Sequence, residues 1–101
     1  MNPSSRRDAW HAIEEQYILK YIAYRFTFEE MSILLPIKAP VLRHRSKDAI
    51  AKRSRALRER YELNKDSGQL NILKLWLLLA TQGFADFNLD ATEIDVAIIS
   101  R

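Results

Sequence analysis

The stretch Arg45–Leu63, RSKDAIAKRSRALRERYEL, decides how the rest of the 101-residue chain is interpreted. A serine just before a run of helix-forming residues caps a helix by accepting a backbone hydrogen bond, and Ser46 stands in that position. Three apolar side chains recur at helical spacing and so share one face: Ile50, Leu57 and Tyr61. The pattern predicts an amphipathic helix from Lys47 to about Leu63.

The charges of the chain are concentrated around this helix. Residues 43–65 carry nine basic and three acidic side chains, whereas residues 1–42 carry five of each and residues 66–101 carry two basic and five acidic ones. Only Asp48 and Glu59 lie within Lys47–Arg60, which is too few to pair with the basic residues of this stretch. Such a local excess indicates a polyanionic partner. Two other interpretations stay open: an acidic protein partner, or a charged face that meets only water.

Arginine predominates over lysine in this segment, which suits contacts to phosphate or guanine. Most of the contacts would go to phosphate, and these give affinity without sequence information. The predicted nucleic-acid contact residues are Arg43, His44, Arg45, Lys47, Lys52, Arg55 and Arg58.

Two further helices precede this segment. Apolar residues at intervals of three and four predict the first from Asp8 to Tyr24. The second follows the capping-box pattern Thr27-Phe28-Glu29-Glu30 and should stop before Pro36, because proline disfavours the helical conformation of the residue before it. The aromatic residues of these helices have the spacing of core residues, and this favours core packing over base stacking for Trp10, Tyr17, Tyr21 and Phe28.

The C-terminal third differs in kind. Residues 70–79 predict a fourth helix, capped by Gly83, with almost no polar face, and a helix that is apolar all round should be buried on all sides. Asp90-Ala91-Thr92-Glu93 is a second capping-box pattern and begins a short last helix. These helices cover the core or form a homodimer or partner interface, and the second is slightly favoured. The predicted interface residues are Leu70, Leu73, Trp76, Leu77, Ile94 and Ile98.

The order Trp10, Glu14-Glu15, Phe28-Glu29-Glu30-Met31, Leu34-Leu35-Pro36 and Arg45-Ser46 resembles the Myb/SANT-like family of homeodomain-like helix-turn-helix domains. The resemblance covers about residues 7–60. It implies an all-α fold with a three-helix unit, residues 7–63. The one or two apolar helices predicted in residues 69–101 are no part of the family pattern and would be added to this unit. The resemblance also implies that Trp10 and Phe28 are core aromatics and that the third helix lies in the DNA major groove. The third family aromatic is missing near Ser54, where Tyr61 is a candidate replacement.

Several function classes have no support in the sequence. There is no cysteine, and His11 and His44 stand apart from any metal-binding pattern, so we expect no metal and no cofactor. No nucleophile elbow or phosphate-binding glycine loop is present, so we expect neither an enzyme nor a small-molecule substrate. The most apolar stretch is about half a membrane span, so we expect no membrane insertion.

The sequence therefore predicts a duplex-DNA-binding protein associated with transcription or chromatin, which self-associates or joins a complex. The resemblance implies the nucleus in a eukaryote, and the cytoplasm or nucleoid otherwise. The alternative is a SANT-type adaptor that joins proteins within a chromatin, transcription or chromosome-segregation complex. In that case, the basic helix would contact an acidic protein surface.

Overall fold

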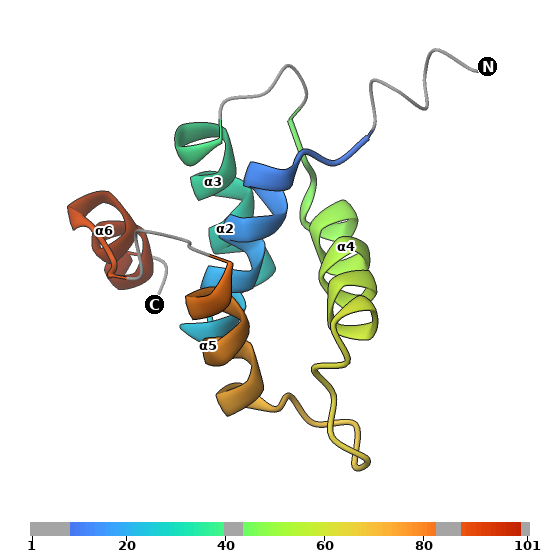
Figure 1. The fold of residues 1–101 in the computed structure, drawn as a ribbon. Helices are drawn as coiled ribbons and strands as arrows, with labels where there is room; N and C mark the ends of the chain where they lie inside the picture. Colours follow the sequence, from blue (N-terminus) through green and yellow to red (C-terminus); the bar gives the residue numbers. More distant parts are fainter. Residues whose placement is uncertain (1–8, 40–43, 83–87, 100–101) are drawn as a thin grey trace.

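The computed structural model describes residues 9–39, 44–82 and 88–99. These residues form an all-helical fold with five helices and no strand (Figure 1): α2 (Ala12–Ala23), α3 (Phe28–Lys38), α4 (Lys47–Arg60), α5 (Ile72–Thr81) and α6 (Ala91–Ile99). Helix α2 packs against α3, α4 and α5, while α6 packs against α3. The predicted all-α class is thus confirmed.

Local capping residues begin the helices where the sequence indicated. The Thr27 hydroxyl accepts from the Glu30 N–H at 3.1 Å, and the Glu30 carboxylate accepts from the Thr27 N–H at 2.7 Å. Ser46 accepts from the Ala49 N–H at 3.2 Å and so caps α4. The first helix starts later than predicted, at Ala12, because the Glu14 carboxylate accepts from the backbone N–H of His11. The predicted cap at Gly83 lies outside the described residues.

The prediction that α3 stops before Pro36 was wrong, because the helix runs through this proline to Lys38. A proline inside a helix removes one backbone hydrogen bond and costs about 3 kcal/mol. Packing offsets this cost, since Leu34, Leu35 and Ala39 around the proline are all buried. The Ala39 N–H also donates to the Leu35 carbonyl at 2.8 Å and closes the last turn.

The core lies where α2 meets its three neighbours. Its aromatic centre is Tyr21, which is fully buried and stacks on Phe26 with ring centroids 5.1 Å apart. Leu75 and Leu79 of α5 belong to the same core as Ile18 and Leu57 of the preceding helices.

Within the described chain, the fourth helix is covered by the core on one face only. Leu75 and Leu79 are fully buried, but Leu73 is 68% exposed and Leu77 is 62% exposed. The reason is geometric: among the helices of the described chain, α5 packs closely only against α2, which can cover one face of it.

A buried charged cluster joins α6 to α2. The Lys20 ammonium lies 3.2 Å from Glu93 Oε1, and both side chains are fully buried. Tyr21 donates its hydroxyl to Glu93 Oε2 at 2.5 Å, and Lys20 also donates to the Asn88 carbonyl at 3.0 Å. Glu93 completes the predicted capping box with Asp90 as well, with both hydrogen bonds at 2.9 Å. One carboxylate therefore begins α6 and holds it against α2.

Candidate nucleic-acid interface

Helix α4 is fixed to the core by one face. Ile50, Ser54 and Leu57 are buried on that face, at the spacing expected of an amphipathic helix. Ser54 stands where the Myb/SANT-like pattern has its third aromatic residue and is only 4% exposed. Tyr61, the candidate replacement, is half-buried against the core at the end of the helix. The inner face thus sets which basic side chains of α4 point outward.

Two of these basic side chains are turned toward α2. Arg53 and Arg60 lie 3.4 and 3.3 Å from the two carboxylate oxygens of Glu15. A hydrogen bond with the Tyr61 side chain, together with the Glu15 carboxylate, raises the pKa of the Arg60 guanidinium. Both arginines are compensated within the molecule by Glu15, and neither is among the predicted contact residues.

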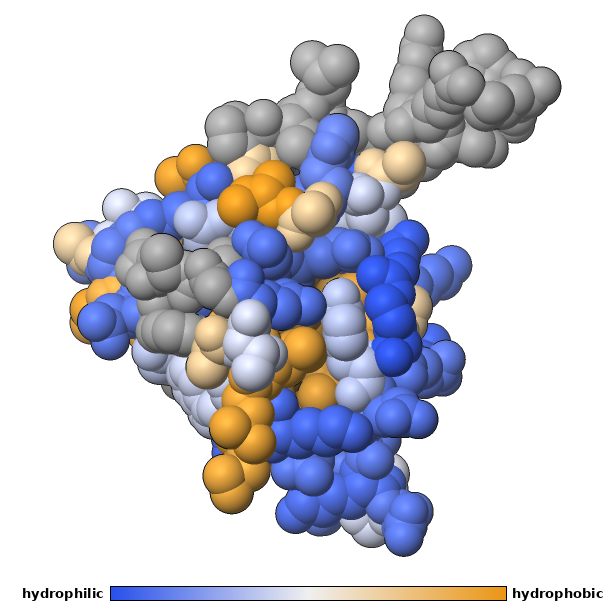
Figure 2. Space-filling model, viewed as in Figure 1, coloured by the Kyte–Doolittle hydropathy of each residue, from blue (hydrophilic) through white to orange (hydrophobic). Residues whose placement is uncertain are grey.

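Lys47, Lys52 and Arg55 form the cationic face of α4. All three are exposed, and none pairs with a carboxylate of the described residues. Figure 2 shows hydrophilic residues over most of the side of the molecule on which α4 lies. Asp48 and Glu59 are exposed on the same helix and reduce its net charge, but Asp48 lies in the first turn, where a negative charge favours the helix dipole.

Arg58 lies beside the cationic face and also makes hydrogen bonds within the protein. Its Nε donates to Asn64 Oδ1 at 2.6 Å, and its Nη2 donates to the Gly68 carbonyl at 3.3 Å. These bonds hold the turn that connects α4 to α5, in which Gly68 takes a positive φ of 88°. Glycine adopts this conformation without strain. A substitution of Arg58 would therefore disturb this turn as well as the surface charge.

The prediction that Arg45 contacts nucleic acid requires a correction, because the structure places this residue inside the molecule. It is 7% exposed, and its Nε and Nη2 lie 2.9 and 3.1 Å from the two carboxylate oxygens of Glu14. Its Nη2 also donates to the Ala9 carbonyl, and its guanidinium lies 4.2 Å from the centre of the Trp10 ring. Because the planar guanidinium binds a carboxylate through two hydrogen bonds and stacks on an aromatic ring, Arg45 joins the loop before α4 to the start of α2.

The two residues before Arg45 complete the predicted set. His44 is exposed next to the start of α4. Arg43 lies outside the described residues. The structure thus brings Lys47, Lys52, Arg55 and Arg58 together on one helix, with His44 just before it.

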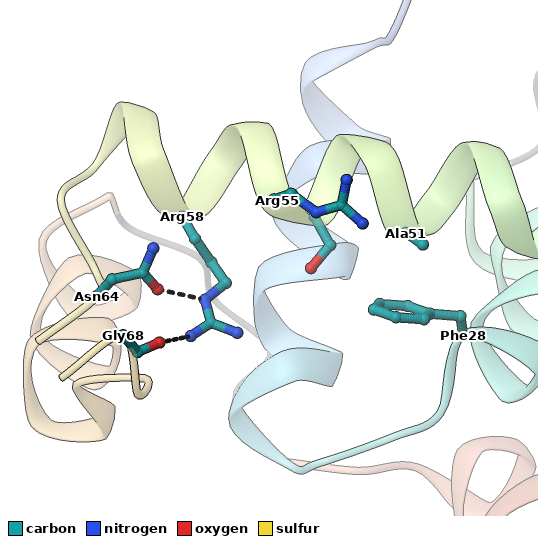
Figure 3. A pocket seen from close by; sticks show the side chains of 7 residues that line it. Phe28, Ala51, Arg55, Arg58, Asn64 and Gly68 are labelled. Atoms are coloured by element: carbon teal, nitrogen blue, oxygen red, sulfur yellow. Dashed lines mark hydrogen bonds between the residues drawn. The ribbon is translucent and has the colours of Figure 1, made fainter.

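Phe28 also departs from its expected place in the core. It is the first residue of α3 and is 39% exposed. Its ring points into a hollow beside α4, between Ala51, Arg55 and Arg58 (Figure 3). The hollow measures about 240 Å³ and is also lined by Ser54, Asn64 and Gly68. The helical spacing that suggested core packing could not show that α4 leaves this ring uncovered.

The predicted partner interface is divided between exposed and packed residues. Trp76 packs edge-on against Tyr24 at a centroid distance of 5.3 Å, and Leu70 is half-buried against the core. The other four predicted interface residues are exposed: Leu73, Leu77, Ile94 and Ile98. Figure 2 shows apolar side chains gathered below the centre of the view, over α5.

Comparisons with protein-family models, curated proteins and solved structures found no match for this chain. Within the described part of the chain, no helix is both long and apolar enough to cross a membrane. No group of three or more His, Asp or Glu side chains gathers there in a way that could hold a metal ion.

Proposed function

We propose that this chain binds duplex DNA through the cationic face of α4, in a Myb/SANT-like arrangement of α2, α3 and α4. The observation that carries the proposal is the exposure of Lys47, Lys52 and Arg55 without a carboxylate partner among the described residues. Uncompensated cations on an exposed helix attract phosphate and release its counterions. A role in transcription or chromatin, in the nucleus of a eukaryote, belongs to the same proposal.

The way α4 is held supports this function. Its inner face is buried, and its sides are tied to α2 by Glu15 and to the following turn by Asn64. A helix held in this way presents its charges in a fixed geometry, so little conformational entropy is lost on binding. Arg55 can then form two hydrogen bonds with a phosphate or a guanine edge, while the lysines act as point charges.

Replacing Lys52 and Arg55 together with alanine should weaken duplex binding and leave the helical content unchanged. Each lost phosphate contact should reduce the slope of log affinity against log salt by about one. A hydrogen bond to a charged group contributes about 1.5–3 kcal/mol, so we expect at least a tenfold loss per side chain at low salt. Fluorescence anisotropy with a labelled duplex at several salt concentrations measures both quantities.

The matched control is Arg53→Ala, because this arginine carries the same charge on the same helix but pairs with Glu15. It should change duplex affinity only slightly. Equal losses of binding free energy per charge removed, in the control and in the double variant, would mean that net charge alone drives binding. If wild-type affinity did not change with salt, the proposed function would be wrong.

A second candidate function, that of a protein-interaction adaptor, is favoured by the exposed apolar side chains of α5. Leu73 and Leu77 lie one helical turn apart and are both more than 60% exposed. Apolar side chains that share a face in this way suit a helix-in-groove contact with another protein or a second copy. The two functions are compatible, because α4 and this face of α5 are separate surfaces.

Replacing Leu73 and Leu77 with glutamate should abolish any self-association without unfolding the protein, because both side chains are already exposed. Light scattering over a range of protein concentrations measures the molecular mass. Lys74→Glu is the matched control, since it changes an exposed charge on the same helix and should not alter the mass. A wild-type protein that remains monomeric throughout would exclude the homodimer.

A further inference from the structure

The hollow beside α4 has a different shape and chemistry from the cationic face. The cationic face is a convex helix surface that suits the major groove, whereas the hollow is concave and has an aromatic ring in its wall. In Figure 3, the Phe28 ring projects from the start of α3 toward the space below Arg55. A paired base inside a duplex shows only its edge to a protein, so it could not enter this hollow.

The size of the hollow fits one nucleobase. A volume of about 240 Å³ corresponds to about eight water molecules at the volume each takes in the liquid. A pyrimidine ring with its substituents has a similar number of heavy atoms. The open hollow therefore has room for one flat heterocycle beside the Phe28 ring.

The side chains around the hollow supply the interactions that an unpaired base needs. The exposed Phe28 ring offers a flat apolar surface for stacking, and base stacking on an aromatic ring tolerates any base. The Arg55 guanidinium lies opposite and can bind the adjoining phosphate or stack on the other face of the base. The Ser54 hydroxyl and the Asn64 amide add polar groups at the edge of the hollow.

We infer that the hollow bounded by Phe28, Arg55 and Arg58 binds an unpaired nucleobase of a nucleic acid, with the adjoining phosphate on Arg55. This inference rests on the proposed function for the phosphate contacts and adds a second element to it. The chain then prefers DNA with an extrahelical or single-stranded base over fully paired DNA. It shows little preference between bases, because stacking supplies most of the energy.

The test compares three DNA probes of the same base sequence: a paired duplex, the same duplex with one extra thymidine on one strand, and the thymidine-containing strand alone. Wild type should bind the bulged duplex about tenfold more tightly than the paired duplex, the scale expected of one stacked base. Phe28→Ala should remove that difference and keep the affinity for the paired duplex. Phe28→Trp should preserve the difference. Ile37→Ala, an exposed apolar residue of α3 that does not line the hollow, is the matched control.

The outcomes separate the two proposals. If wild type binds the paired duplex and the bulged duplex equally, or if Phe28→Ala weakens both by the same factor, the base site is wrong and the function of α4 stands. If wild type fails to bind the paired duplex but binds the other two probes through Phe28, duplex binding is wrong and the base site stands. Thymidine monophosphate should not displace the bulged duplex at equal concentration, and if it did, a free nucleotide would be the ligand instead.

Discussion

Replacing Glu93 with alanine should lower the free energy of unfolding by about 3–5 kcal/mol, because removing one partner of a buried ion pair leaves the other poorly compensated in a low-dielectric interior. Glu93 lies 3.2 Å from the buried Lys20 ammonium, accepts the Tyr21 hydroxyl and caps α6. A loss of this size is a large part of the total stability of a small domain. Urea unfolding followed by circular dichroism measures it.

Two further variants test this explanation. Asp95→Ala removes a carboxylate from an exposed position in the same helix and should change stability by less than about 0.5 kcal/mol. Glu93→Gln keeps the side-chain length and a hydrogen-bond acceptor but removes the charge, so its loss should be intermediate. If Glu93→Ala were no more destabilising than Asp95→Ala, the buried cluster would not hold α6 in place.

Replacing Arg45 with alanine should have a similarly large effect on stability, again about 3–5 kcal/mol, and little direct effect on DNA binding. Among the described contacts, the buried Glu14 carboxylate would keep only the backbone N–H of His11. Trp10 would lose the nearer of the two guanidinium groups over its ring and keep that of Arg53, which lies 5.4 Å from the ring centre. Thermal and urea unfolding measure the stability, and anisotropy at low temperature, where the variant is folded, measures the affinity.

The exposed neighbour Lys47 gives the opposite expectation and serves as the control. Lys47→Ala should leave stability nearly unchanged but weaken duplex binding, because its side chain belongs to the cationic face. A folded Arg45→Ala protein that lost as much affinity as Lys47→Ala would place Arg45 at the interface after all. A double-mutant cycle with Glu14→Ala would also show coupling if the pair interacts as the structure has it.

The features that the sequence predicted well are those decided within one turn of a helix. The capping patterns at Thr27, Ser46 and Asp90 gave correct helix starts, because a cap needs only a side chain and the backbone N–H three residues later. The division of α4 into an apolar and a cationic side was equally local. Periodicity placed Ile50 and Leu57 in the core, and both are fully buried.

The features that it missed depend on partners far along the chain. Arg45 belongs to a basic run, and only the fold brings the Glu14 carboxylate within hydrogen-bond distance of it. The helix through Pro36 depends in the same way on the burial of its neighbours. Phe28 has the spacing of a core residue, but neighbouring helices decide whether a ring is covered. The position of Lys20 inside an apolar helix was the one signal of a buried charge that the sequence offered. Its meaning depends on Glu93, which only the fold brings close to it.

The buried charged cluster around Lys20 limits which fragments of the chain can fold on their own. The carboxylate that compensates this ammonium comes from 73 residues later, on a helix of nine residues that is too short to be stable alone. We therefore expect that α2, α3 and α4 do not fold stably as a separate fragment. A fragment that ends before α6 would keep the Lys20 ammonium at a core position but would lack the Glu93 carboxylate. Expression of α2, α3 and α4 by themselves would require Lys20 to be redesigned, for instance as leucine or methionine.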